Sequence, residues 1–85
     1  MARSTNGRHL AERGPRDRDV KAAVVGRLRE NPYTDGSRIR VRVSGGVVTL
    51  GGEVDTPMAK AVARDDAGIV PGVREVADAL IVRAA

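Results

Sequence analysis

The stretch of sequence that decides the fold is RIRVRVSGGVVTL, residues 38–50. Its first six residues alternate between arginine and an aliphatic side chain, which is the pattern of a strand with one buried and one exposed face. Gly45-Gly46 then predicts a tight hairpin, because glycine adopts the positive φ angles that such a turn requires. The return strand is predicted over residues 47–54. The core side of the first strand carries Ile39, Val41 and Val43, and the solvent side carries Arg38, Arg40 and Arg42.

A helix is predicted on each side of this hairpin in the sequence. Val20, Val24 and Leu28 recur at helical spacing, with Asp17 expected as the N-cap and Asn31-Pro32 as the stop. The second helix is expected to be capped by Asp55 or Thr56, to begin at Pro57 and to end at Pro71-Gly72. Its predicted face of small and apolar side chains comprises Met58, Ala59, Ala61, Val62, Ala63 and Ala67.

A third strand is predicted over residues 73–82, with Val76, Leu80 and Val82 facing inward. The connection from the second strand to the third through a helix is a crossover, which makes these two strands parallel. The fold class is therefore α+β: a two-layer αββαβ sandwich, with a three-stranded mixed sheet and both helices packed on one face. The order of the three strands stays open.

The composition allows one small domain. The chain has 85 residues with no Cys, Trp or Phe and one Tyr, which excludes a disulfide scaffold and a Cys-ligated zinc site. Val, Leu and Ile number 13, 4 and 3, so the core must be built from aliphatic side chains. No apolar run predicts a transmembrane helix or a signal peptide. The expected location is cytoplasmic as written, or periplasmic or envelope-associated if an upstream signal was removed.

The net charge of +4 is concentrated at the N-terminus. Residues 1–18 contain five arginines against Glu12 and Asp17, a net charge of +3. We predict a disordered basic arm over residues 1–16, a single domain over 17–83 and a tail of residues 84–85. The arm is either a solvated tail or an electrostatic arm for nucleic acid or anionic lipid, and its role stays open.

Two glycine motifs make the chain resemble a known family. Gly46-Val47-Val48-Thr49-Leu50-Gly51-Gly52 is followed about twenty residues later by Val70-Pro71-Gly72-Val73-Arg74-Glu75-Val76. This combination resembles the BON domain of bacterial osmotically induced and nodulation proteins. The resemblance implies an αββαβ fold and a non-catalytic role in binding phospholipid surfaces or other envelope polymers.

The chain departs from the family pattern in two ways. It shows one copy of the domain without a signal peptide, and Asp66 occupies a second-helix position that is usually aliphatic in the family. A carboxylate facing a small core needs a partner, so either the helix is rotated slightly or Asp66 meets an arginine at the rim.

The residues predict neither catalysis nor a bound cofactor or metal. His9, the one histidine, lies in the arm, and Asp65 and Asp66 point about 100° apart on a helix. The glycine pairs lack the lysine of a phosphate-binding loop. We instead expect turn geometry and close approach of a helix to the second strand to explain the pairs Gly45-Gly46 and Gly51-Gly52. The predicted structural motif comprises Gly45, Gly46, Gly52, Pro71 and Gly72.

Two binding functions compete. In the first, Arg38, Arg40 and Arg42 bind anionic phospholipid or a related envelope polymer through the sheet face opposite the helices. In the second, the open face or an edge strand contacts a protein partner or a second copy of the chain. The partner face would consist of Val47, Thr49, Ala77, Ala79 and Ile81. Nucleic acid ranks third, because Tyr33 is the one aromatic side chain available for stacking.

Overall fold

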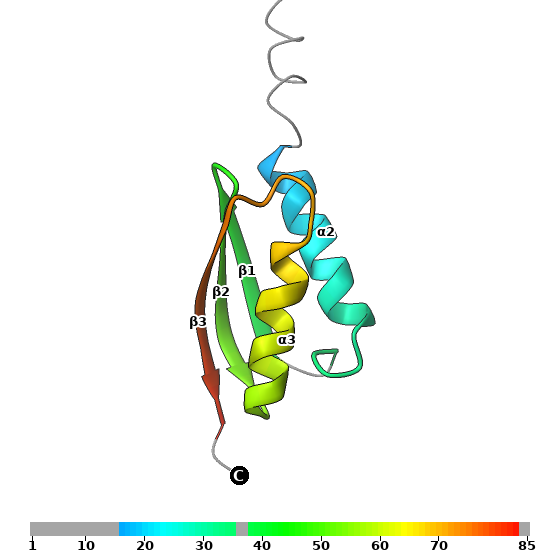
Figure 1. Ribbon diagram of the computed structural model, residues 1–85, viewed down its shortest axis with the longest axis vertical. Helices are drawn as coiled ribbons and strands as arrows, with labels where there is room; N and C mark the ends of the chain where they lie inside the picture. The colour runs from blue at the N-terminus through cyan, green and yellow to red at the C-terminus, as the bar shows by residue number, and fades with distance from the viewer. Residues whose placement is uncertain (1–15, 36–37, 84–85) are drawn as a thin grey trace, which may run out of the picture.

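The computed structural model describes residues 16–35 and 38–83. In chain order the elements are α2 (Asp17–Glu30), β1 (Arg38–Ser44), β2 (Val47–Val54), α3 (Pro57–Gly68) and β3 (Glu75–Val82). Both helices lie on the same face of the sheet (Figure 1), which confirms the predicted two-layer αββαβ sandwich. The predicted arm, apart from Arg16, and the tail of residues 84–85 lie outside the described residues.

The sheet has the order β1-β2-β3. The β1 and β2 strands pair in antiparallel fashion, from Ser44 opposite Val47 at the turn to Arg38 opposite Glu53. The β2 and β3 strands run parallel, as the crossover through α3 requires. The sequence left the strand order open, and the structure places β2 in the centre of the described sheet with β1 and β3 at its two edges.

The core lies between this sheet and the two helices. On α2 the predicted residues Val20, Val24 and Leu28 are all buried. On α3 the buried residues are Ala59, Ala63 and Ala67, and their small side chains allow the helix to pack closely on β2 and β3. The prediction that Met58 and Ala61 share this face was wrong: both are exposed, because the buried positions recur every fourth residue from Ala59 and these two point elsewhere.

The helix termini follow the sequence in part. Thr56 caps α3, its hydroxyl oxygen accepting the N–H of Ala59 at 3.0 Å, and Pro57 is the first helical residue, as predicted. The α3 helix ends at Gly68, three residues before Pro71, and β3 begins at Glu75 rather than at residue 73.

The prediction that Asp17 caps α2 was wrong. The N-cap position belongs to Arg16, without a side-chain cap. The carboxylate of Asp17 instead accepts the backbone N–H groups of Gly45 and Gly46, at 2.9 and 3.2 Å. Two successive N–H groups in a glycine turn form a concave donor site for an anion. The Asp17 carboxylate therefore binds this turn and does not cap α2.

The two glycine motifs meet at this turn. Gly45 and Gly46 have φ angles of 57° and 83°, as the predicted hairpin requires. A Cβ on Gly46 would lie 3.0 Å from the carbonyl oxygen of Gly72, and the N–H of Arg74 donates to the carbonyl of Gly46 at 2.8 Å. The β1–β2 turn is thereby joined to the segment that leads from α3 into β3.

The expectation that a helix approaches closely at the second glycine pair, Gly51-Gly52, was wrong. Gly52 has a φ angle of 106°, and a Cβ there would overlap the backbone carbonyl oxygen of Arg38 on β1. The approaching group is a neighbouring strand. Gly51 has open space where its Cβ would lie, with nothing within 4 Å.

Neither described helix is long and apolar enough to cross a membrane.

We predict opposite effects of alanine at the two adjacent glycines. Gly52→Ala combines a strained left-handed φ angle with a backbone overlap, and should lower the free energy of unfolding by about 2 kcal/mol or more. Gly51→Ala should be neutral or raise it by up to about 1 kcal/mol, because alanine loses less conformational entropy in a strand. Urea denaturation measures both, and equal destabilisation by the two would contradict the assignment.

We also predict that Asp17→Ala destabilises the fold more than Asp19→Ala. Both changes remove a carboxylate from the first turn of α2, so their effects on the helix dipole are similar. Asp17→Ala alone also removes the acceptor for two turn N–H groups, at about 1–3 kcal/mol. The difference between the two urea midpoints reports that contribution, and coincident midpoints would show that the contact contributes nothing.

Candidate functional site

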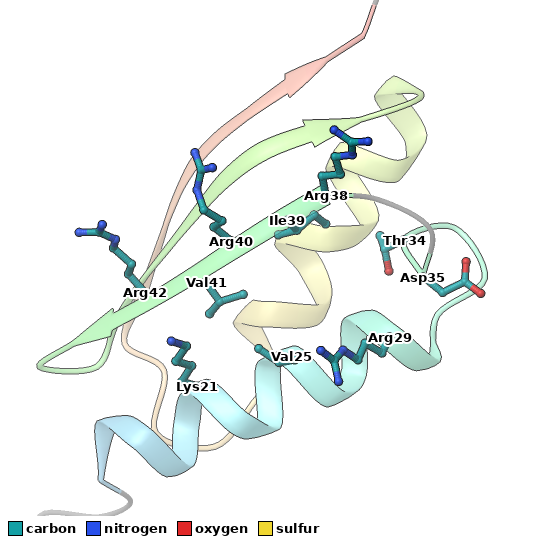
Figure 2. Close-up of a pocket in the computed structure, with 10 residues that line it drawn as sticks. All are labelled: Lys21, Val25, Arg29, Thr34, Asp35, Arg38, Ile39, Arg40, Val41 and Arg42. Carbon is teal, nitrogen blue, oxygen red and sulfur yellow. The ribbon is translucent and has the colours of Figure 1, made fainter.

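The exposed face of β1 carries the predicted row of arginines. Arg38, Arg40 and Arg42 are exposed, whereas Val41 between them is buried and Ile39 and Val43 are partly buried. In Figure 2 the three arginines extend from the strand on the side away from α2, and Val41 points toward the helix. Same-face neighbours along a strand lie about 6.6–6.8 Å apart, so the row presents three evenly spaced guanidinium groups.

The strand register shows what lies beside each arginine on the open face of the sheet. On β2, Val47 and Thr49 alternate with the buried residues Val48 and Leu50. The two predicted partner-face residues therefore point away from the helices. The rows across the sheet are Arg42–Thr49–Ala77, Arg40–Gly51–Ala79 and Arg38–Glu53–Ile81, with Val47 beside Glu75 near the turn. All five predicted partner-face residues therefore lie on one face, and Ile81 is 63% exposed.

The charge on this face is uneven. Glu53 and Glu75 also lie on it, and the Oε1 atom of Glu53 is 3.9 Å from the Nε atom of Arg83. The positive charge therefore concentrates along β1, while β3 contributes aliphatic side chains and a carboxylate. The alternation in residues 38–43 predicts the arginine row but not these glutamates, which lie on β2 and β3.

A shallow hollow lies on the half of the open face that is farther from the β1–β2 turn. Gly51 has no side chain and Ala79 beside it has only a methyl group, so the surface is depressed next to Arg40. The hollow measures about 530 Å³. Its lining comprises Arg38, Arg40, Gly51, Gly52, Glu53, Ala79 and Ile81.

A second depression runs between α2 and the outer edge of β1 (Figure 2). Val25, Ile39 and Val41 provide apolar lining, and Lys21 and Arg29 of α2 join the three arginines of β1 around it. We call this depression, of about 580 Å³, the α2–β1 groove. Asp35 is the one carboxylate among its ten lining residues.

Sequence reasoning missed Lys21 and Arg29 as parts of a site. A signal existed, because Lys21, Val25 and Arg29 recur every four residues and so lie along one side of the helix. What the sequence did not show is which flank of the helix lies beside the first strand.

Of the adjacent carboxylates Asp65 and Asp66, Asp66 has a structural role. Asp66 accepts a hydrogen bond from Nδ2 of Asn31 at 2.7 Å, and its Oδ1 atom lies 3.7 Å from Nη2 of Arg27. The expected arginine at the rim is therefore present. Asp65 is exposed on α3, so the two side chains do not share one site.

Across residues 16–35 and 38–83, no three His, Asp or Glu side chains come together in a way that could hold a metal ion. His9 lies outside the described residues. The guanidinium, ammonium and aliphatic side chains that line the two depressions can bind anions and apolar groups.

Comparison with known protein families identifies a match over most of the chain. The model of the family described as BON domain matches residues 16–84, which covers both glycine motifs and every helix and strand above. No curated protein matches the chain.

Proposed function

The chain belongs to the BON domain family, and on that premise we propose that it attaches to anionic phospholipid, or to a related cell-envelope surface, through the open face of its sheet. The family is known as a binding module that is non-catalytic in general and is associated with phospholipid. The finer proposal concerns this chain: the ligand is anionic, the contact surface is the arginine row, and the protein has no enzymatic activity of its own.

The observation that carries the proposal is the exposed row of Arg38, Arg40 and Arg42. A guanidinium group donates two parallel hydrogen bonds to a phosphate, and three such groups on a flat strand match a layer of phosphate headgroups. Ile81 and Ala79 lie on the same face, where they can contact the apolar part of a lipid.

A protein partner is the second candidate. It is supported by the exposure of Ile81, at 63%, in the company of Ala77 and Ala79 on β3. A patch of this kind suits a protein contact as well as a lipid surface. The cellular location of the protein also stays a prediction, because neither the lipid function nor the protein-partner function requires one particular compartment.

We predict that Arg38→Ala/Arg40→Ala/Arg42→Ala abolishes most binding to phosphatidylglycerol vesicles in a flotation assay at low salt. Each basic residue close to an anionic membrane contributes about 1 kcal/mol, so the loss should be on the order of 100-fold. The matched control removes three exposed arginines from the helix side, Arg16, Arg18 and Arg64. Equal losses in the two variants would assign binding to net charge alone, and absence of binding by the unaltered protein would reject the lipid proposal.

A pair of glycine variants tests which face is used. At both Gly51 on the open face and Gly26 on α2, an added Cβ would have no neighbouring atom within 4 Å, so the backbone at each position accepts a side chain. Gly51→Glu places a carboxylate directly beside Arg40 and should weaken vesicle binding by ~10-fold. Gly26→Glu changes the net charge by the same amount and should have little effect. The reverse ranking would place the lipid-binding surface on the helices.

A further inference from the structure

The outer edge of β1 presents backbone groups that point away from the sheet. Ser44 and Val47 are partners that flank the two-residue turn, and the residues that flank such a turn exchange two backbone hydrogen bonds. Hydrogen-bonded and non-bonded pairs alternate along an antiparallel ladder. The N–H and C=O groups of Arg38, Arg40 and Arg42 therefore face β2, and those of Ile39, Val41 and Val43 face outward. In the described part of the chain, no strand lies on that outer side.

Cations surround this edge from both sides of the sheet. The arginine row lies along the open face, and Lys21 and Arg29 lie across the α2–β1 groove (Figure 2). Val25 and Val41 lie between the two sets of charges, in the apolar part of the groove. A strand added beside β1 would have alternate side chains on the two faces. One set would lie beside the arginine row, and the other would lie over the groove between Lys21 and Arg29.

The charges select among possible partners for the edge. A second copy of β1 would place arginines opposite arginines, and like charges directly opposite each other destabilise strand pairing. An acidic strand would instead pair with Arg38, Arg40 and Arg42 through every second residue. The residues between these would lie over Val25 and Val41, where small apolar side chains fit.

We propose that the β1 edge binds an extended acidic segment of a partner protein by strand addition. The segment carries Asp or Glu at alternate positions and small apolar residues between them. Main-chain hydrogen bonds to Ile39, Val41 and Val43 supply affinity, and the three arginines pair with the acidic side chains. Lys21 and Arg29 add longer-range attraction for the negatively charged segment. This site shares Arg38, Arg40 and Arg42 with the lipid proposal but does not rest on it, because the backbone groups of the β1 edge and the helix-side cations are not part of the open face.

A synthetic peptide of alternating Glu and Val, about eight residues long, covers the seven residues of β1 and is the probe. Its binding should protect the amide protons of Ile39, Val41 and Val43 from hydrogen exchange. The amides of Arg40 and Arg42 already face β2 and should change little. Protection that does not follow this two-residue period would overturn strand addition.

Backbone N-methylation of the peptide gives a second test. One peptide is methylated at the Glu nitrogens and another at the Val nitrogens. Methylation removes a donor and blocks approach only where the N–H faces β1, so one peptide should lose binding and the other should retain it. Which of the two peptides loses binding then shows whether the peptide pairs with β1 in parallel or in antiparallel orientation. Equal affinities of the two methylated peptides would overturn the proposal.

Charge reversal separates this site from the lipid surface. Lys21→Glu/Arg29→Glu should weaken peptide binding by ~10-fold or more, and the control Arg18→Glu/Arg64→Glu has the same net charge but changes residues outside the groove lining. Vesicle binding should respond equally to the two double variants. Vesicle binding without peptide binding would overturn the edge site and leave the lipid proposal standing. Peptide binding without vesicle binding would support the edge site and overturn the lipid proposal.

Discussion

The Gly45-Gly46 turn is the constraint on which the arrangement of the strands and the start of α2 depends. Its two backbone N–H groups donate to the carboxylate of Asp17. The same turn lies against Gly72 and accepts the N–H of Arg74. Three segments far apart in the sequence therefore meet at one end of the sandwich: the start of α2, the β1–β2 turn and the entry to β3. Glycine is required at the turn for its positive φ angles and for the close approach of Gly72.

The turn also determines which side chains can act on a ligand. Pairing Ser44 with Val47 fixes the register of β1 on β2, and a shift by one residue would send the arginines into the core and the valines to solvent. The two faces of β1 and its edge thus have distinct roles. Valines stabilise the core, arginines face solvent, and the outward backbone groups stay available for pairing.

Much of this could be predicted from the sequence, because the decisive signals are local. Alternation in residues 38–43 indicates the two faces of β1, and the glycine pair indicates the hairpin. The failures involve groups that are distant in sequence. Asp17 satisfies the ordinary preference for a helix cap, but a turn 28 residues away competes for its carboxylate. The sequence predicts a helix contact for Gly52, whereas a carbonyl of β1 requires the glycine. The spacing of Lys21 and Arg29 shows in the sequence that they lie on one side of α2. Only the packing of α2 on β1 shows that this side borders the first strand.

The distribution of charge over the three strands indicates how a ligand would be oriented. On the open face, Glu53 and Glu75 offset part of the arginine charge, and Arg83 is engaged with Glu53. Around the β1 edge, by contrast, five cations line the groove with one carboxylate. Attraction for an anion therefore increases across the sheet from β3 to β1. A flat anionic surface would meet the β1 side of the open face first, and an acidic strand would meet the edge itself. Both ligands would use the same three arginines, so occupation of the edge by an acidic strand would reduce the charge left for a membrane.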